Sequence, residues 1–263
     1  MIDSAVVVQY PEVLYPVTIM SVPHILFLSV LLPVAVFCAS KLAKKYGFTK
    51  KIFWVCAFIA MVCETEKILF FVREAAGGFR LPAEHLPFNM CTFQILLIFI
   101  VMLSANPQKH KILLSFMFPT MIAGGFMGMF VASAVQDFHG LLDIATYRYF
   151  FFHAMVVFLG FYLYFSKPIR YDIKSYLSAL FFAYVMLISG IWMNAFFGWY
   201  PNANFMFSAR PPSEGLPIIN LNNGWTGYIF AIMCLGLLLI TLCYLPVIIR
   251  EARDFLKSRK KSV

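Results

Sequence analysis

Residues 226–249 decide the class of this 263-residue chain, because they read TGYIFAIMCLGLLLITLCYLPVII, a run of 24 residues without a charge. A helix rises about 1.5 Å per residue, so about 20 apolar residues cross the roughly 30 Å hydrocarbon core of a bilayer. Long apolar runs that do not alternate with period two favour helices, which satisfy their own backbone hydrogen bonds in lipid. The run therefore predicts a transmembrane helix.

Six further stretches meet the same test. They are residues 20–40, 52–72, 88–104, 112–135, 147–165 and 176–199. The composition agrees, since 62% of the residues are hydrophobic and only 13% are charged, against about 25% in soluble domains. It excludes a water-soluble globule, a disordered chain and a secreted disulfide scaffold. We predict an all-α, polytopic membrane protein with one domain, residues 1–263, that forms a bundle of seven transmembrane helices.

The lysines and arginines predict the orientation of this bundle. Sixteen of them lie in the loops at 41–51, 105–111 and 167–174 and in the tail from residue 250. The opposite side carries only four, which are Arg73, Arg80, Arg148 and Arg210. Because cytoplasmic loops of membrane proteins are enriched in basic residues, we expect the N-terminus outside and the C-terminus inside. The net charge of +9 then reflects orientation and contact with anionic lipids, and we expect no nucleic-acid partner.

Motifs of soluble enzymes are missing from the sequence. No Gly-rich phosphate loop, HExxH or GxSxG pattern occurs, and the spacing of the six cysteines predicts no zinc site. We therefore expect no metal and no cofactor. The functional signal lies instead in polar residues inside the predicted spans, which are costly in lipid and usually face the bundle interior.

These polar residues come from five predicted spans and share the outer third of the bilayer. They are His24, Glu64, Glu66, Lys67, Asn89, Cys91, Gln94, His153 and Asn194. The shared depth predicts one cavity that opens toward the outer leaflet. Structural roles are the alternative, since span histidines commonly bond neighbouring helices and Glu64 can pair with Lys67 three residues on. Gly124 and Gly128 fit close helix packing.

Cys91 differs from the other cysteines in its position. Pro87 favours the first turn of a helix, so Cys91 is expected in or near the first turn of the span at 88–104. The unpaired amides and the positive dipole end of a helix N-terminus favour a thiolate. A histidine at the same depth can act as its base.

The sequence Leu86-Pro87-Phe88-Asn89-Met90-Cys91 resembles the Leu-Pro-x-x-x-Cys segment that opens the third span of the YwaF-like family of bacterial membrane proteins. Further matches follow in the same order from about residue 24 to 246. They are His24, Glu66, the pair Gly124-Gly125, His153 after Arg148, and Asn204-Phe-Met-Phe followed by Arg210-Pro211. The chain departs from the family at Thr92, where an acidic residue is common, and at Phe205, where tyrosine is usual.

This family is similar to eukaryotic transmembrane protein 164, a seven-span Cys–His acyltransferase that acts on ether phospholipids. The resemblance implies that Cys91 and His153 are the catalytic pair. His24, Glu66 and Asn204 match further family positions, and we expect His24 and Glu66 to orient the pair or bind the acceptor. Asn89, Gln94 and Asn194 are candidate donors to an oxyanion.

The leading hypothesis is a phospholipid acyltransferase that works without coenzyme A, in the cell membrane of a bacterium. Its partners are phospholipids and lysophospholipids, and Cys91 forms a thioester while His153 serves as general acid and base. The same pair with water as acceptor makes a lipase. A transporter or channel for a small solute is the alternative, although no internal repeat is visible and the polar cluster lies near one leaflet. A signalling receptor has only the number of spans in its favour.

Overall fold

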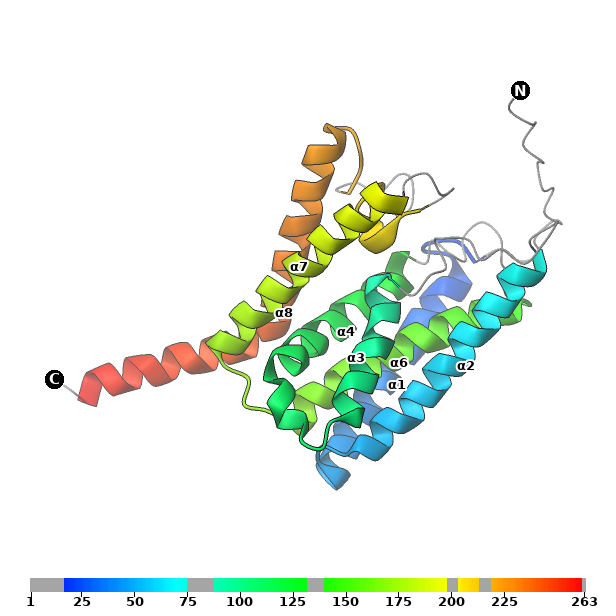
Figure 1. Ribbon diagram of the computed structural model, residues 1–263. Coiled ribbons are helices and arrows are strands. Elements are labelled where there is room, and N and C mark those ends of the chain that lie inside the picture. Colours follow the sequence, from blue (N-terminus) through cyan, green and yellow to red (C-terminus); the bar gives the residue numbers. More distant parts are fainter. Residues whose placement is uncertain (1–16, 75–87, 132–139, 198–202, 213–218, 262–263) are drawn as a thin grey trace.

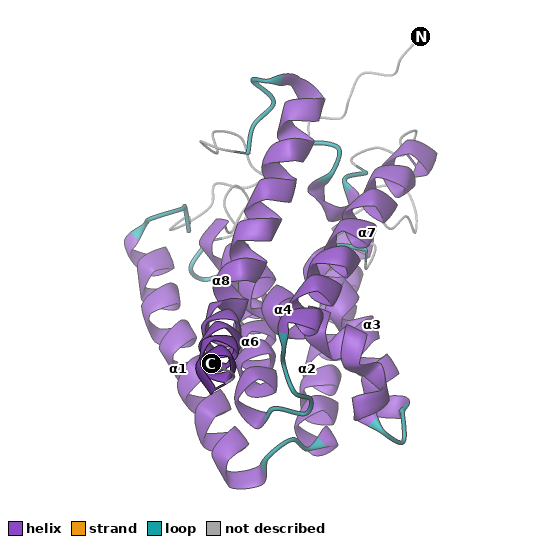
Figure 2. Ribbon diagram, turned by 90° about the vertical axis from the view of Figure 1, so that its left-hand side faces the viewer, coloured by secondary structure: helices purple, strands orange, loops and turns teal. Residues whose placement is uncertain are grey.

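The computed structural model describes residues 17–74, 88–131, 140–197, 203–212 and 219–261. Seven α-helices lie in these ranges: α1 (Val22–Tyr46), α2 (Lys50–Glu74), α3 (Met90–Leu103), α4 (Lys111–Val131), α6 (Ile144–Ser166), α7 (Ile173–Phe197) and α8 (Gly224–Lys261). Two 3₁₀ helices, η2 (Pro107–His110) and η3 (Phe205–Phe207), precede α4 and α8. Figure 2 shows no strand in the described ranges. The all-α prediction is therefore confirmed.

Five helices among the described residues are long and apolar enough to cross a membrane, namely α1, α4, α6, α7 and α8. The prediction of a multi-pass membrane protein is therefore confirmed at this level. Inside α2, the charged residues Glu64, Glu66 and Lys67 lie close together and lower the hydropathy of its second half. α3 has 14 residues and begins at Met90, because Phe88 and Asn89 precede the helix and Asn89 is extended (φ −87°, ψ 156°).

α4 and α6 form the centre of the bundle (Figure 1). In each of them 56% of the apolar stretch is buried, against 17% in α1, α7 and α8. The two helices pack closely at glycines, as small residues allow in membrane bundles. A Cβ atom on Gly160 of α6 would lie 2.8 Å from the backbone nitrogen of Ile122, and one on Gly125 of α4 would lie 2.9 Å from the carbonyl oxygen of His153.

The basic loops meet at one end of the bundle. The hydroxyl of Tyr162, near the end of α6, donates to the carbonyl oxygen of Gly47 in the first of these loops (2.6 Å). The ammonium of Lys111 lies 3.0 Å from the carboxylate of Asp172, which joins the loops before α4 and α7. The three basic loops therefore share one face, as the charge pattern predicts.

Asp172 also holds the start of α7. Its carboxylate accepts hydrogen bonds from the backbone nitrogen of Ser175 (2.8 Å) and from the Ser175 hydroxyl (2.9 Å). Partial burial of the carboxyl raises its pKa, but these hydrogen bonds and the Lys111 ammonium outweigh burial and lower the pKa of Asp172 to about 2. The carboxylate therefore stays charged at any physiological pH.

α8 is the longest helix, with 38 residues, and it bends so that its C-terminal part leaves the bundle (Figure 1). Pro246 lies within the helix, and sharp bends of helices occur mostly at proline. Before the bend, the buried Tyr244 hydroxyl donates to the carbonyl oxygen of Ser115 in α4 (2.9 Å). The first part of α8 is thereby tied to the bundle, and the last part carries exposed basic residues away from it.

Candidate functional site

The predicted site residues gather at the end of the bundle opposite to the basic loops. His24 lies in the first turn of α1 and Cys91 in the first turn of α3, and both helices run toward basic loops. His153 lies in the first half of α6, which also ends at a basic loop, and Asn194 lies near the opposite end of α7. These four residues therefore lie toward the same end of the bundle.

Cys91 is the second residue of α3. The side chain of Asn89 makes no capping hydrogen bond to this helix; its Oδ1 instead accepts from the backbone nitrogen of Met206 in η3 (3.2 Å). The first amides of a helix have no partner within the helix. Cys91 therefore belongs to the turn of α3 whose backbone N–H groups have no partner within the helix. Leu86 and Pro87, the first part of the motif, lie outside the described residues.

His153 is buried, with 8% of its surface exposed. Its Nδ1 lies 2.8 Å from the carbonyl oxygen of Tyr149, one turn earlier in α6. A carbonyl oxygen can only accept, so in the neutral ring Nδ1 carries the proton and Nε2 carries the lone pair. This is the tautomer that a general base requires at Nε2.

Both side chains lie against one face of α4. A Cβ atom on Gly124 would be 3.6 Å from Cys91 Sγ, and one on Gly128 would be 2.5 Å from His153 Nε2. Residues four apart on a helix are neighbours on one face, with Cβ atoms about 5–6 Å apart. The thiol and the imidazole therefore cover adjacent positions of the same surface, although no hydrogen bond links them among the described residues. The two glycines thus allow close packing, and the groups that pack against them are the side chains of Cys91 and His153.

Tyr149 completes this arrangement, and sequence reasoning missed it. Its hydroxyl donates to the carbonyl oxygen of Gly128 (2.7 Å), while its own carbonyl oxygen accepts from His153. Its ring lies 4.3 Å from the imidazole, centroid to centroid. The one signal in the sequence was its position four residues before His153, which places both on one helical face.

His24 fixes α1 to α4 and is fully buried. Its Nε2 lies 2.8 Å from the carbonyl oxygen of Met129, and its Nδ1 accepts from the backbone nitrogen of Met20 (2.9 Å). Both ring nitrogens are therefore occupied by backbone groups. Because Met129 follows Gly128, His24 supports the segment of α4 against which His153 packs. Among the described residues, no hydrogen bond links the side chains of His24 and His153.

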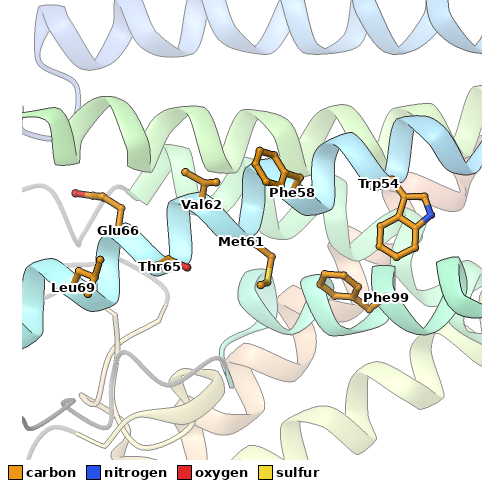
Figure 3. Close-up of a pocket in the computed structure, with 8 residues that line it drawn as sticks. All are labelled: Trp54, Phe58, Met61, Val62, Thr65, Glu66, Leu69 and Phe99. Atoms are coloured by element: carbon orange, nitrogen blue, oxygen red, sulfur yellow. The ribbon is translucent and has the colours of Figure 1, made fainter.

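Glu66 pairs with Arg148, the residue before Tyr149, and Glu64 lies 2.5 Å from Lys67. The expected Glu64–Lys67 pair is thus present. The Glu66 side chain is 40% exposed and also lines a groove of about 750 Å³ along α2. Figure 3 shows Glu66 and Leu69 at one end of this groove and Trp54 with Phe99 at the other. Cys91 and His153 are not among its lining residues.

Gln94 lies one turn after Cys91 and is fully buried. Its Nε2 donates to the hydroxyl of Thr120 in α4 (2.8 Å), and this hydroxyl donates onward to the carbonyl oxygen of Phe116 (2.6 Å). The Gln94 Oε1 is buried and has no hydrogen-bond partner among the described residues. Its free polar atom is thus an acceptor, whereas an oxyanion needs donors.

The side-chain amides of Asn194 and Asn204 hold the segment around η3. Asn194 bonds the backbone nitrogen and oxygen of Phe205 and the hydroxyl of Ser208 at 2.8–3.0 Å. Asn204 accepts from the backbone nitrogens of Ala209 and Arg210 and donates to the Arg210 oxygen. Among the described residues, the hydrogen bonds of these two amides go to η3 and the residues that follow it, and Met206 of η3 bonds Asn89 beside α3. No group of three or more His, Cys, Asp or Glu side chains suited to a metal ion occurs among the described residues.

Comparison with known proteins identifies a family. The family model of the TMEM164 family matches residues 19–244, which include every helix up to the bend of α8. No curated protein and no solved structure matches the chain. The expected relation to transmembrane protein 164 is confirmed, while the narrower YwaF-like assignment stays a prediction. On this match over most of its length, the chain belongs to the TMEM164 family.

Proposed function

We propose that this protein is a membrane acyltransferase that moves an acyl chain between phospholipids through a thioester on Cys91. The observation that carries the proposal is the placement of Cys91 Sγ and His153 Nε2 on adjacent glycine positions of α4, with the lone pair of the imidazole on Nε2. A nucleophile beside a base whose tautomer is fixed by a third group is the arrangement used in covalent catalysis. Membership of the TMEM164 family supports it.

The reaction has two balanced steps. In the first, His153 Nε2 takes the thiol proton, the sulfur attacks the ester carbonyl of the donor, and the carbon–oxygen bond breaks as the protonated imidazole gives its proton to the departing lysophospholipid. In the second, Nε2 takes the proton of the acceptor hydroxyl. The acceptor oxygen attacks the thioester, the carbon–sulfur bond breaks, and Cys91 recovers the proton.

The first-turn N–H groups of α3 are our candidate oxyanion donors. They belong to the same turn as the sulfur, and a helix N-terminus stabilises negative charge. Asn89 contributes by joining this turn to η3. Because the amides of Gln94, Asn194 and Asn204 are committed to Thr120 and to the segment around η3, we assign these three residues to positioning.

The substrates in this proposal are phospholipids and lysophospholipids of the surrounding membrane, which we take to be a bacterial cell membrane. A site buried among helices favours reactants that arrive through lipid over a soluble acyl carrier. The proposed mechanism needs no metal and no coenzyme A.

The topology that we propose has seven spans, with the N-terminus outside and the C-terminus inside. The shared face of the basic loops supports it, because those loops then lie together in the cytoplasm. α3 is about 21 Å long at 1.5 Å per residue, so with its last turn at the inner surface Cys91 lies below the outer surface. Labelling of cysteines introduced at Lys45 and Lys257 tests the topology: both must react only from the cytoplasmic side.

The decisive experiment uses purified protein with a phospholipid donor, a lysophospholipid acceptor and no coenzyme A. We expect acyl transfer and a hydroxylamine-sensitive thioester on Cys91. Cys91→Ala must abolish both, and His153→Ala must lower the rate by roughly 10²–10⁴-fold. Cys63→Ala and Cys234→Ala serve as matched controls that keep activity. Wild-type transfer by a folded Cys91→Ala protein contradicts the proposal. Release of free fatty acid in place of transfer assigns the same pair to a lipase.

A further inference from the structure

We propose that the cavity lined mainly by α4, α7 and α8 holds the acyl chain of the thioester, beginning next to its carbonyl group. This inference rests on the proposed acyl transfer through Cys91. The cavity has a volume of about 170 Å³, and 14 of its 16 lining residues are apolar or glycine. It is distinct from the larger groove along α2, whose lining residues include neither Cys91 nor any residue of α4.

The cavity begins beside the nucleophile. Met90 and Gly124 belong to its lining, and a Cβ atom on Gly124 would lie 3.6 Å from Cys91 Sγ and 3.7 Å from the Met90 side chain. Only the width of a glycine therefore separates the thiol from the cavity. The first carbons of an acyl group bonded to the sulfur therefore need to span only this short distance to enter the cavity.

The wall of the cavity suits hydrocarbon and disfavours water. Its two polar side chains are Thr120 and Tyr184, and each hydroxyl donates to a backbone carbonyl oxygen, of Phe116 (2.6 Å) and of Met233 (3.4 Å). An apolar cavity of about 150 Å³ in another protein stays dry and takes up benzene, a six-carbon molecule. The cavity here is of that size, so about six carbons of a chain fit.

The cavity runs from the core toward the surface. Thr120 and Ile240 are 5% and 3% exposed, whereas Met233 and Phe207 in the same wall are 37% and 39% exposed. The remainder of a longer chain can thus continue past α7 and α8 into the lipid. A closed pocket would limit the length of the acyl chain. This open cavity instead contacts only the carbons nearest the carbonyl group, so it selects for the structure of that part of the chain.

Gly236 of α8 offers a way to fill the cavity without disturbing the fold. It lines the cavity, and a Cβ atom there meets no atom within 4 Å. Alanine or leucine at a mid-helix glycine also favours the helical backbone. The series Gly236→Ala, Gly236→Leu and Gly236→Phe therefore removes increasing volume, and Leu238→Phe, which adds bulk at a side chain 54% exposed, is the matched control.

The test measures acylation of Cys91 by p-nitrophenyl acetate, hexanoate and octanoate in the full-length protein, with a phospholipid donor in parallel. With each p-nitrophenyl ester the thiolate attacks the carbonyl, the carbon–sulfur bond forms, the ester carbon–oxygen bond breaks and p-nitrophenolate leaves; with the phospholipid the leaving group is the lysophospholipid. In the wild type and in Leu238→Phe, the rate must rise from acetyl to octanoyl. Since one methylene in an apolar pocket changes selectivity about 10–200-fold, Gly236→Leu must lower the octanoyl-to-acetyl ratio at least about tenfold, Gly236→Ala less and Gly236→Phe more.

The outcomes separate the two proposals. Unchanged ratios in the Gly236 series, or equal slowing of all three esters, with Cys91 still acylated, overturn the cavity assignment and leave the acyltransferase standing. A wild-type protein whose Cys91 is acylated by neither the esters nor the phospholipid overturns the acyltransferase, and the acyl cavity with it.

Discussion

Gly128 and His153 approach so closely that no side chain fits between them, since a Cβ atom on Gly128 would stand 2.5 Å from Nε2 and closer still to Cδ2. The imidazole thus rests on bare backbone of α4. The position of the imidazole therefore depends on the lack of a side chain at Gly128 as well as on the Tyr149 carbonyl oxygen that bonds Nδ1.

Gly128→Ala is therefore expected to displace the imidazole. A misplacement of about 1 Å can cost a reaction 10²-fold, so transfer must fall by about that factor or more. Helix propensity works in the opposite direction, because alanine favours the helix by up to about 1 kcal/mol. Initial rates and thermal unfolding of one sample separate the two effects.

Gly124→Ala is the matched comparison for Gly128→Ala. Its methyl group meets Cys91 Sγ at 3.6 Å, which is ordinary contact, so the loss of activity must be clearly smaller. Equal losses at both positions would refute the specific role of Gly128.

Tyr149→Phe removes the hydrogen bond to the Gly128 carbonyl and leaves the His153–Tyr149 backbone contact in place. The free energy of unfolding must fall by about 0.5–1.5 kcal/mol, the usual net contribution of one hydrogen bond. The transfer rate must fall much less than in His153→Ala. Chemical denaturation and initial rates check the two statements, and a loss as large as that of His153→Ala would make the hydroxyl itself catalytic.

Gly160→Ala must destabilise the bundle. The added Cβ would meet the Ile122 side chain at 2.7 Å and the Ile122 backbone nitrogen at 2.8 Å, and a helix backbone cannot yield locally. Overpacking of this kind costs about 1–3 kcal/mol. Thermal unfolding in detergent measures it, with Gly236→Ala as control, since its Cβ meets no atom within 4 Å. An unchanged Gly160→Ala midpoint would contradict the close packing of α4 on α6.

Asp172 predicts a loss of stability in acid. Its folded pKa of about 2 lies below the ordinary value of 3.8, so its stabilising contribution is complete above pH 4 and is lost as the pH falls toward 2. Asp172→Asn must lower the unfolding midpoint at neutral pH, and the difference from wild type must shrink below pH 4. A difference that is constant from pH 7 to pH 2 would show that the charge is not responsible.

The sequence predicts the helices well because their apolar runs are long, and the five described helices that are long and apolar enough to cross a membrane confirm it. It predicts the start of α3 less well, because the predicted span begins at residue 88 and the helix begins at Met90. Asn89 could cap α3, but its side chain bonds Met206, which is 117 residues away in the chain. A tertiary partner of this kind leaves no local pattern.

The candidate site follows the same division. Cys91 and His153 stand out as polar groups at one depth, and depth is readable from topology. Tyr149 does not stand out, because the chain contains 13 tyrosines and 30 phenylalanines and the aromatic residues follow no clear pattern. The amide partners of Gln94 and Asn194 depend on packing between helices, and both amides could equally have faced a substrate.

In the proposed mechanism, the hydrogen bond between His153 Nδ1 and a backbone carbonyl takes the place of a third, acidic residue. A carboxylate in that place would have to give up its hydration shell inside the membrane, at a cost of several kcal/mol. A main-chain oxygen is already dehydrated, cannot be titrated and cannot be replaced by any single side-chain substitution. Thr92, which stands where the family that the sequence resembles often has an acid, is therefore compatible with the proposed dyad, in which Cys91 and His153 are the two side chains that exchange protons with the substrates.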